Sequence, residues 1–413
     1  MLTQRGANDV LAQAYTGVRQ HSLDICAPLA VDDYGVQPTD DVSPPKWHLA
    51  HTTWFFETFL LKPEVPTYSV FDAAFEYLFN SYYNGVGEQH PRTQRGSLSR
   101  PTLEQVLSYR EHVDIAMQEL LHALPNEQVQ QSVVLGLHHE QQHQELLATD
   151  IKYILGTNPT HPAYFDAPAE FADGPNETRR PMPLTYAEFA GGLRDVGCDA
   201  SDSSSSFLFD NETPRHKVYL QPFQFAKRLI TNAEYLAFVD DGGYERADLW
   251  LSEGWAAVHA GRFGKLPAPL YWRQRDGNWF EYRLTGLQEL ALYEPVSHVS
   301  YYEADAFARW AGKRLPTEFE WEVAALTNQP ADSVEQLSDC LWQWTQSAYL
   351  PYPGYRPLPG TLGEYNGKFM SGQMVLRGGS VATPAGHNRP TYRNFFYPPD
   401  RWQFTGIRLA ADL

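Results

Sequence analysis

The sequence predicts an α+β protein, in which a four-helix bundle is followed by an irregular α+β domain. A chain of 413 residues exceeds the usual size of one hydrophobic core, so two domains are expected. Helical signals fill the N-terminal part, and Pro, Ala and Asp are frequent from 157 to 183. Short alternating segments among many Gly, Pro and Trp residues follow. We therefore expect a helical domain at residues 1–165, a linker at 166–183 and a second domain at 184–413.

The helix boundaries in the first domain follow from capping and stop signals. Ser99 and Pro101 are typical of a helix start. Pro63 is expected to stop a helix, and Gly156 suits the position just after a helix end. Segment 68–100, rich in Tyr, Asn, Gly and Arg, is expected to be a long connection. The four helices are expected at residues 8–21, 45–62, 102–124 and 126–155.

The second domain has weaker periodic signals. His216, Val218 and Leu220 form one side of an alternating segment, which is typical of a strand. Two helices are expected at 301–311 and 317–326, and long irregular loops fit much of the rest.

Composition restricts the partners and the compartment. The net charge of −18 disfavours nucleic acid and anionic lipid as partners. The richest apolar stretch, TTWFFETFLL, is too short to span a bilayer, and MLTQRGANDVL lacks the pattern of a signal peptide. Cys26, Cys198 and Cys340 are far apart and form no CxxC pair, which favours buried, inert thiols in a reducing compartment. We expect a cytoplasmic protein that binds neither membranes nor nucleic acid.

A histidine motif carries the clearest chemical signal. In HHEQQHQE (138–145), His139 and His143 are four residues apart on an expected helix, so both imidazoles lie on one face. Glu140 completes an HExxH string, the pattern of zinc hydrolases in which the glutamate acts as base. A third ligand is expected from His48 or His51 in KWHLAH. Three imidazoles without a carboxylate suit zinc or iron(II), although such residues are also common as ordinary polar helix positions.

Motifs from both domains resemble one enzyme family. WHLAHTTWFFE and HHEQQHQELLATD are similar to the DinB-like iron domain of the ergothioneine sulfoxide synthases. The C-terminal part resembles their formylglycine-generating-enzyme-like domain, which has a C-type-lectin-like fold. The strings that carry this second resemblance are FDNETPRH (209–216), PVSHVSYYEADAFARWAGKRLPTEFEWE (295–322), LWQWTQSAYLPYPGY (341–355), VLRGGS (375–380) and TYRNFFYPPDRWQFTGIRLA (391–410).

The resemblance implies an Fe(II) site and an O2-dependent reaction. Enzymes of this family join a thiol sulfur to C2 of the imidazole of hercynine, the Nα-trimethylated histidine, and form a sulfoxide. The motif match implies that His51, His139 and His143 are the iron ligands, with His48 as scaffolding. It also implies that Glu140 is not a base but a residue that supports either the ligands or the fold.

The C-terminal domain departs from the copper oxidases that it resembles. True formylglycine-generating enzymes carry two copper-binding cysteines shortly after RGGS, where this chain has Thr383 and Asn388. We therefore expect this domain to hold substrate and not copper.

Aromatic and amide side chains are candidates for the hercynine site. Phe395 and Phe396 match the family's hercynine segment, and aromatic faces suit a trimethylammonium group. Asn394 is expected to hold the hercynine carboxylate, and Gln142 to contact its imidazole. Relatives that use γ-glutamylcysteine carry an acidic residue in this segment, so its absence favours cysteine as the sulfur donor. Packing in the core is the alternative for the two phenylalanines.

The connection at 68–100 holds the candidates for the thiol and for proton transfer. Arg92 and Arg95 are expected to bind the thiol's carboxylate, because a guanidinium pairs with it bidentately; solvated surface arginines are the alternative. Tyr82 or Tyr83 is expected to be a proton donor that disfavours simple thiol oxidation; packing is again the alternative.

Several other functions stay open at this point. A selenoneine synthase would join a selenosugar to hercynine at the same kind of site. A 5-thiohistidine synthase would act on histidine, but its relatives usually carry an additional methyltransferase domain. A zinc hydrolase and a non-catalytic metal- or ligand-binding module are the alternatives from other classes.

Overall fold

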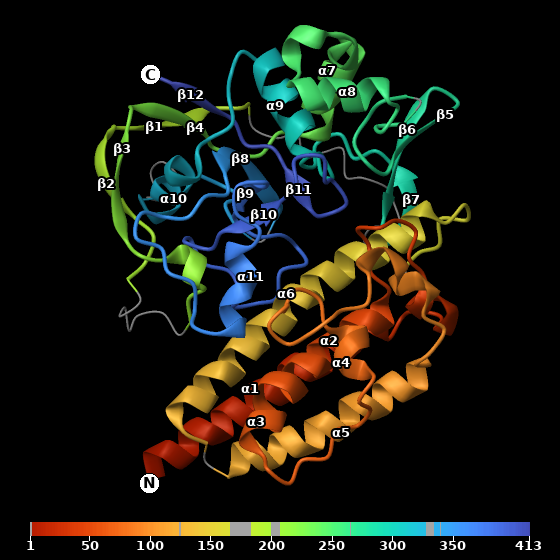
Figure 1. Ribbon diagram of the computed structural model, residues 1–413. Coiled ribbons are helices and arrows are strands. Elements are labelled where there is room, and N and C mark those ends of the chain that lie inside the picture. The colour runs from red at the N-terminus through yellow and green to blue at the C-terminus, as the bar shows by residue number, and fades with distance from the viewer. Residues whose placement is uncertain are drawn as a thin grey trace. The chain divides into compact units, whose positions relative to one another are not determined.

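The computed structural model describes residues 2–123, 125–165, 183–199, 207–264, 266–327, 334–338 and 340–413 (Figure 1). The chain divides into two compact units. The first consists of Met1–Phe165 and Pro359–Tyr365, and the second of Asp166–Leu358 and Asn366–Leu413. The N-terminal part is helical and the C-terminal part is mixed, so the predicted α+β class is confirmed. Apart from Pro183, the expected linker 166–183 lies outside the described residues.

Four long helices build the first unit. In Figure 1 they form a bundle. The first long helix packs against the fourth, and the second packs against the third and the fourth. The long helices are α1 (Leu2–Cys26), α2 (Pro45–Phe56), α5 (Leu103–His122) and α6 (Glu127–Thr157). The shorter elements are η1 (Val31–Gly35), η2 (Glu57–Leu61), α3 (Lys62–Glu64), α4 (Phe75–Phe79) and η3 (Arg92–Ser97).

Three of the expected helix boundaries are wrong. Pro63 does not stop the helix, because a π-helical turn (η2) precedes it and the helix continues to Glu64. Ser99 does not cap α5: the hydroxyl of Thr102 accepts a hydrogen bond from the Gln105 amide, and the Gln105 side chain accepts one from the Thr102 amide. Gly156 lies inside the last turn of α6 and not after it.

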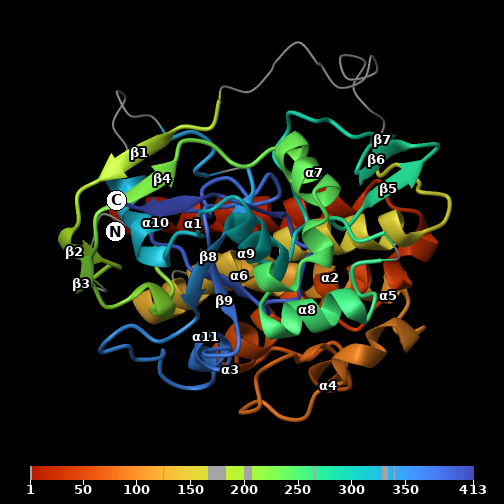
Figure 2. The same ribbon diagram turned by 90° about the horizontal axis from the view of Figure 1, so that it is seen from above.

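The described residues of the second unit form four small sheets. Strands β2 and β3 lie at one end of this unit and β5–β7 at the other (Figures 1 and 2). One sheet has the order β1-β4-β12 and another the order β10-β9-β8-β11, in which only the β11–β8 pair is parallel. The strands are β1 (Tyr186–Phe189), β2 (Gly192–Val196), β3 (His216–Leu220), β4 (Phe223–Ala226), β5 (Trp272–Arg275), β6 (Asn278–Arg283), β7 (Gly286–Glu289), β8 (Trp342–Ala348), β9 (Met374–Arg377), β10 (Asn394–Phe396), β11 (Thr405–Gly406) and β12 (Ala410–Asp412).

Helices and short turns cover these sheets. The expected segment at 216–220 is strand β3, and the expected helices at 301–311 and 317–326 correspond to α9 and α10. Phe223 and Phe225 of β4 pack with Trp321 of α10 in one buried cluster. The other helical elements among the described residues are η5 (Asp210–Glu212), α7 (Asn232–Asp240), η6 (Gly243–Glu245), η7 (Ala247–Leu249), α8 (Ser252–His259), α9 (Tyr301–Trp310), α10 (Glu318–Thr327), η9 (Thr361–Gly363) and α11 (Glu364–Gly367).

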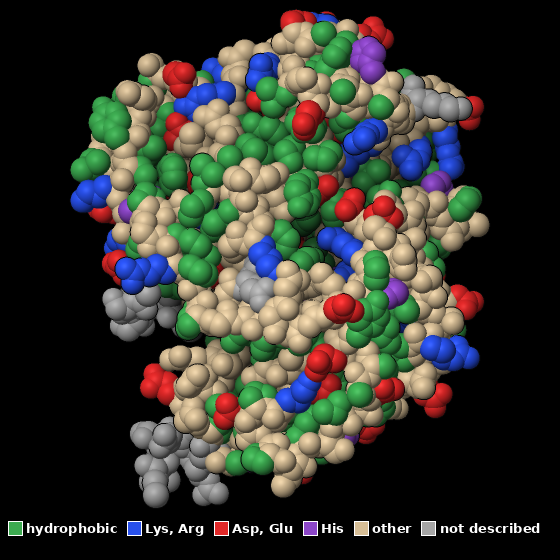
Figure 3. Space-filling view, in the orientation of Figure 1, with side chains coloured by type: hydrophobic (Ala, Val, Ile, Leu, Met, Phe, Trp, Pro, Cys, Tyr) green, Lys and Arg blue, Asp and Glu red, His purple; other side chains and the backbone are tan. Residues whose placement is uncertain are grey.

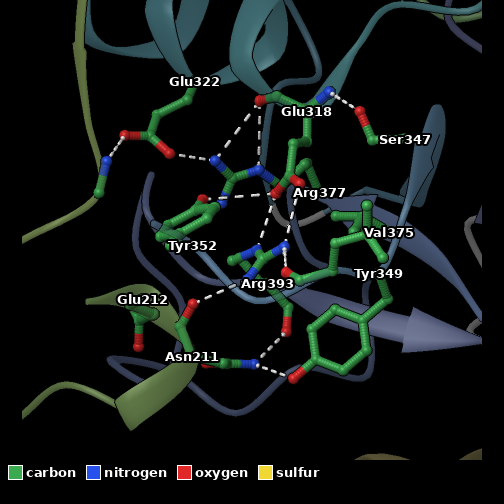
Figure 4. Close-up of polar contacts among 12 residues, drawn as sticks. Asn211, Glu212, Glu318, Glu322, Ser347, Tyr349, Tyr352, Val375, Arg377 and Arg393 are labelled. Carbon is green, nitrogen blue, oxygen red and sulfur yellow. Dashed lines mark hydrogen bonds and ion pairs between the residues drawn. The ribbon is translucent and has the colours of Figure 1, made fainter. Parts of the chain in front are cut away.

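A buried charge network anchors the strand that bears the expected hercynine segment (Figure 4). Arg393, directly before β10, donates from Nε and Nη2 to Glu318 of α10 at 2.8 and 3.0 Å. Arg377 at the end of β9 pairs with Glu322 on the same helix. Both arginines are fully buried, so removing either carboxylate would leave an uncompensated charge in the core. The network thereby fixes β9 and β10 against α10.

The described helices include none that combines the length and the hydropathy of a membrane-spanning segment. On the face shown in Figure 3, acidic and basic side chains are interspersed rather than gathered by sign.

Candidate metal centre

Three histidines from two helices meet inside the helical unit. His51 lies on α2, and His139 and His143 lie one turn apart on α6. One ring nitrogen from each lies within 4.8 Å of the others, and all three residues are buried. The structure therefore brings together the three histidines that the motif match implied as metal ligands.

The orientation of His51 is fixed by its own helix and by a backbone carbonyl. Trp47 and Trp54, four residues before and three after it, stack on its ring with centroid distances of 4.6 and 5.6 Å. Its Nδ1 lies 2.6 Å from the carbonyl oxygen of Phe79. A carbonyl only accepts, so Nδ1 carries the proton and the lone pair resides on Nε2. That Nε2 lies 3.3 Å from Nε2 of His139 and faces the common centre.

The two α6 histidines have different surroundings. Phe55 of α2 stacks on the His139 ring at 4.6 Å and 26°. His143 meets a second imidazole, since its Nδ1 lies 2.9 Å from Nδ1 of His48. His48 in turn contacts Asp150 through Nε2, at 3.0 Å. His48 is therefore not a ligand of this cluster but a neighbour of one ligand.

Burial keeps the three imidazoles neutral. It lowers the pKa of His139 to about 4, although neighbouring Glu140 opposes the shift. The pKa values of His51 and His143 lie well below the usual range, first because of burial and then because each faces other imidazoles. Neutral imidazoles are the form that binds a metal ion.

The donor set fits a metal such as zinc or iron(II). Imidazole nitrogen suits both ions, and three protein ligands leave coordination positions for other molecules. Aromatic rings from α2 surround the cluster and exclude water from it. The arrangement can therefore hold a buried metal ion, but it does not by itself distinguish the two metals.

Glu140 faces away from the histidine cluster. Its carboxylate pairs with Arg19 at 2.9 Å and Arg110 at 2.5 Å, and accepts a hydrogen bond from Ser22 at 2.7 Å. Burial alone would raise its pKa, but Arg110 and Arg19 lower it to about 2. Both oxygens of this carboxylate accept hydrogen bonds, and a carboxylate of such low pKa is a poor general base. The HExxH string is present in the sequence, but its glutamate is structural.

The two arginines predicted for the thiol differ in environment. Arg92 is exposed, and its guanidinium donates to the Asp41 carbonyl. Arg95 is buried, with its guanidinium 3.3 Å above the ring centre of Trp47. It donates to two serine hydroxyls, Ser43 at 2.9 Å and Ser81 at 3.0 Å. Among the described residues no carboxylate forms an ion pair with Arg95, and burial lowers its pKa to about 9.

The predicted tyrosines and glutamine lie in the same unit. Tyr83 is buried, and its ring packs against Trp54 at 5.7 Å and Phe55 at 6.4 Å, which stack on two of the histidines. Tyr82 is half-buried and interacts electrostatically with Arg95. Gln142 is half-buried on α6, directly before His143.

The residues predicted for hercynine lie on β10 of the second unit. Side chains alternate along a strand, so Asn394 and Phe396 share one face and Phe395 lies on the other. The Phe395 ring stacks on Tyr349 at 4.1 Å, whereas Phe396 meets Trp402 edge to face at 5.7 Å. The two phenylalanines therefore have different neighbours.

At the expected copper positions, Thr383 and Asn388 hydrogen-bond to the adjacent backbone. The Thr383 hydroxyl accepts from the Ser380 amide at 2.8 Å, and the Asn388 side-chain amide donates to the Gly378 carbonyl. Both side chains thus brace the turn that follows β9.

Sequence reasoning missed the groups that surround the ligands. Asp150, the Phe79 carbonyl and the stacking of Trp47 were not expected. A helical-wheel argument could have found Asp150, because it lies seven residues after His143 and thus on the same face of α6. No sequence signal pointed to the Phe79 carbonyl, because a backbone oxygen carries no residue identity.

Comparisons with known proteins agree with the division of the chain into two units. Residues 14–147 match the DinB superfamily and residues 176–336 match the sulfatase-modifying factor enzyme 1-like domain family. A hercynine oxygenase of Mycobacterium tuberculosis is 32% identical, covering 90% of this chain and 92% of its own. One from Mycolicibacterium thermoresistibile is 30% identical, covering 90% and 88%. A formylglycine-generating enzyme of Streptomyces coelicolor is 37% identical, but covers only 37% of this chain and 48% of its own.

The full-length relatives cover both units, whereas the formylglycine-generating enzyme covers part of the chain only. Together with the buried histidine cluster, they confirm the resemblance drawn from the motifs. The chain belongs to the hercynine oxygenase family.

Proposed function

We propose that the protein is a non-haem Fe(II), O2-dependent sulfoxide synthase that joins cysteine to C2 of the hercynine imidazole. The reaction balances without another reductant: hercynine, thiol and O2 give the sulfoxide and one water. The C2–H, S–H and O–O bonds break and the C–S and S–O bonds form; one oxygen atom goes to sulfur, and the other leaves with both hydrogens as water. The observation that carries the proposal is the buried, neutral three-histidine cluster in a chain similar to hercynine oxygenases over 90% of its length.

The bound iron supplies the site at which thiol and O2 are activated. His51, His139 and His143 hold it, and their neutral state needs no deprotonation before the metal binds. Trp47, Trp54 and Phe55 keep the imidazoles oriented and the site dry. Gln142 is proposed to contact the hercynine imidazole, because it is adjacent to His143 on α6.

We propose Arg95, rather than Arg92, as the main partner of the thiol's carboxylate. Its buried guanidinium donates to two serine hydroxyls and lies over the Trp47 ring, so an incoming carboxylate would supply a directly paired negative charge. Arg95→Lys keeps the charge but loses the bidentate geometry, and is expected to raise the KM for cysteine about 10- to 100-fold. Arg92→Lys is the matched control and should change that KM by about twofold or less. Equal effects of both variants, measured by initial rates, would contradict this assignment.

Tyr82 and Tyr83 are the proposed proton donors near the reacting sulfur. Loss of a positioned acid typically slows the step it assists by about 10²–10⁴-fold. In Tyr82→Phe or Tyr83→Phe, we expect more of the cysteine to be oxidised without forming a C–S bond. The measurement is the ratio of cysteine sulfinate to hercynine sulfoxide by mass spectrometry. An unchanged ratio in both variants would remove the tyrosines from the mechanism.

On β10, we propose that Phe396 and Asn394 bind hercynine, while Phe395 holds the strand in place. The support is the strand alternation and the stacking of Phe395 on Tyr349. A cation–π contact contributes about 0.5–2 kcal/mol, so Phe396→Leu should raise the KM for hercynine about 2- to 30-fold. Phe395→Leu should instead lower the melting temperature. The reverse pattern would show that Phe395 is the ring that faces the cation.

An oxygen-uptake assay coupled to mass spectrometry tests the whole proposal. Apo-protein is reconstituted anaerobically with Fe(II) and then given hercynine and O2, with cysteine, γ-glutamylcysteine or a selenosugar in separate reactions. A hercynine–cysteine sulfoxide formed with one O2 consumed per product is the expected result. Product from the selenosugar alone would make the protein a selenoneine synthase. No product and no oxygen uptake with any donor, despite bound iron, would refute the synthase and favour a binding module.

The zinc hydrolase alternative has less support. A hydrolase of the HExxH type needs its glutamate beside the metal-bound water. Glu140 is instead paired with Arg19 and Arg110.

A further inference from the structure

We propose that Asp150 and His48 form a positioning pair that orients the metal ligand His143 and raises the affinity of the site for its metal. The inference rests on the three-histidine site of the proposed function, but not on which substrate is turned over there. Neither residue belongs to the three-histidine cluster.

The three residues form a continuous chain across two helices. Asp150 lies two turns after His143 on α6, and His48 reaches between them from α2. Oδ2 of Asp150 lies 3.0 Å from Nε2 of His48, whose Nδ1 lies 2.9 Å from Nδ1 of His143. Asp150, His48 and His143 are 3%, 4% and 6% exposed, so water does not compete for these hydrogen bonds.

These two hydrogen bonds also determine which ring nitrogens of His48 and His143 carry a hydrogen. An ionised carboxylate only accepts, so the His48 Nε2 carries a hydrogen and donates it to Asp150. In the tautomer that carries its hydrogen on Nε2, Nδ1 of His48 bears a lone pair and accepts the Nδ1 hydrogen of His143. His143 is left with its lone pair on Nε2, which can then serve as the ligand atom that it offers to the cluster. Only this tautomer of His143 can bind a metal ion through Nε2.

The carboxylate itself is held in place. The same Oδ2 of Asp150 accepts a hydrogen bond from the backbone amide of Ser43 at 2.8 Å. The Trp47 ring lies edge-on to His48 at 5.6 Å, which restricts rotation of the imidazole. His48 is thus confined by a carboxylate, a metal ligand and an indole ring. A carboxylate that acts through an intervening imidazole performs the same task as one bonded directly to a ligand.

The size of the effect follows from known outer-sphere partners. Removing a hydrogen-bond partner of a metal-bound histidine usually weakens metal binding about 10- to 100-fold. His51 provides an internal contrast, because its Nδ1 is held by the Phe79 carbonyl, which no side-chain substitution removes. We therefore expect substitutions at His48 and Asp150 to affect the metal site through His143, the ligand that His48 contacts.

Metal affinity, measured without substrates, tests this pair. The probe is Co(II), titrated into full-length apo-protein in competition with a chelator. His48→Gln and Asp150→Asn should weaken Co(II) binding about 10- to 100-fold. His122→Gln, at an exposed position on α5, is the matched control and should bind as the parent does. Melting temperatures of the apo-proteins identify any variant that fails to fold.

A second readout does not depend on affinity. In the Zn(II)-loaded, 15N-histidine-labelled parent, the NMR spectrum should show His143 protonated at Nδ1 and metal-bound at Nε2. In folded His48→Gln this Nδ1 hydrogen should exchange faster with water. Unchanged Co(II) affinity in both folded variants, or a parent that lacks the Nδ1 hydrogen or binds no metal, would overturn the proposal. A parent that binds Co(II) as expected but forms no sulfoxide with Fe(II) would refute the proposed reaction and leave the positioning pair intact.

Discussion

Replacing His139 with alanine is expected to abolish stoichiometric metal binding and to lower O2-dependent turnover by at least ~10³-fold, about 4 kcal/mol in the barrier. His139 supplies one of only three imidazoles, and its ring is held between Phe55 and the other two ligands. Two ligands would then be left. Among the described residues, no other His, Cys, Asp or Glu side chain belongs to this cluster and could take the place of His139. Metal content after reconstitution and oxygen uptake are the measurements.

The control lies one residue away on the same helix. His138→Ala makes the same substitution at a half-buried position that does not belong to the cluster. It should retain about one metal ion per chain. Full metal content in folded His139→Ala would show that the cluster is not the metal site. A loss in both variants, together with a lower melting temperature, would indicate damage to α6 instead.

Glu140→Gln is expected to have the largest effect on stability. Glu140 is fully buried and lies between Arg19 and Arg110. Removing one partner of a buried ion pair typically costs about 3–5 kcal/mol, because the remaining charge is left without compensation. Arg19 keeps a second carboxylate, Asp114 at 2.7 Å, so the lower end of that range is expected. Chemical denaturation of the apo-protein at neutral pH measures the difference.

Metal binding separates the two possible roles of Glu140. A folded Glu140→Gln protein should still bind metal stoichiometrically and should turn over wherever it is folded. A catalytic base would behave in the opposite way, with stability near that of the parent and activity lost. Glu111→Gln, an exposed carboxylate on α5, serves as the matched control and should leave the free energy of unfolding nearly unchanged.

The contribution of Glu140 to the free energy of unfolding also depends on pH within a defined range. Its pKa is about 2 in the folded protein, against about 4.3 in an unfolded chain. A lowered carboxyl pKa stabilises the fold above the unfolded value, and this contribution is lost as the pH falls from about 4.3 towards 2. The free-energy difference between parent and Glu140→Gln should therefore narrow below about pH 4.3. A difference that stays constant over this range would show that the charge of Glu140 is not the cause.

The lowered pKa of His139 gives a second pH range over which the stability changes, and it applies to both the parent and Glu140→Gln. Its folded pKa of about 4 lies below the unfolded value of about 6.5. The unfolded chain therefore takes up a proton first, and the apo-protein loses stability as the pH falls from about 6.5 towards 4. Bound metal opposes this loss, because it competes with protons for the same nitrogen.

Local periodicity was enough to predict much of the helical unit. The four-residue spacing of His139 and His143 placed them on one face of a helix, and the structure agrees, because helical geometry is independent of what packs around it. The motifs of both units also identified the family. The strand at 216–220 and helices α9 and α10 were predicted for the same reason, since their signals are contained in a few consecutive residues.

Tertiary packing alone decided the roles of individual side chains. Whether His48 or His51 belongs to the cluster depends on how α2 lies against α6. In the structure His51 lies in the cluster, whereas His48 contacts Asp150. Glu140 follows a metal ligand in sequence, yet one step of about 100° around the helix turns it towards Arg19 and Arg110. Sequence specifies which face a residue occupies within its own element. The partner that meets that face comes from a distant part of the chain, and its identity is fixed only when the elements pack.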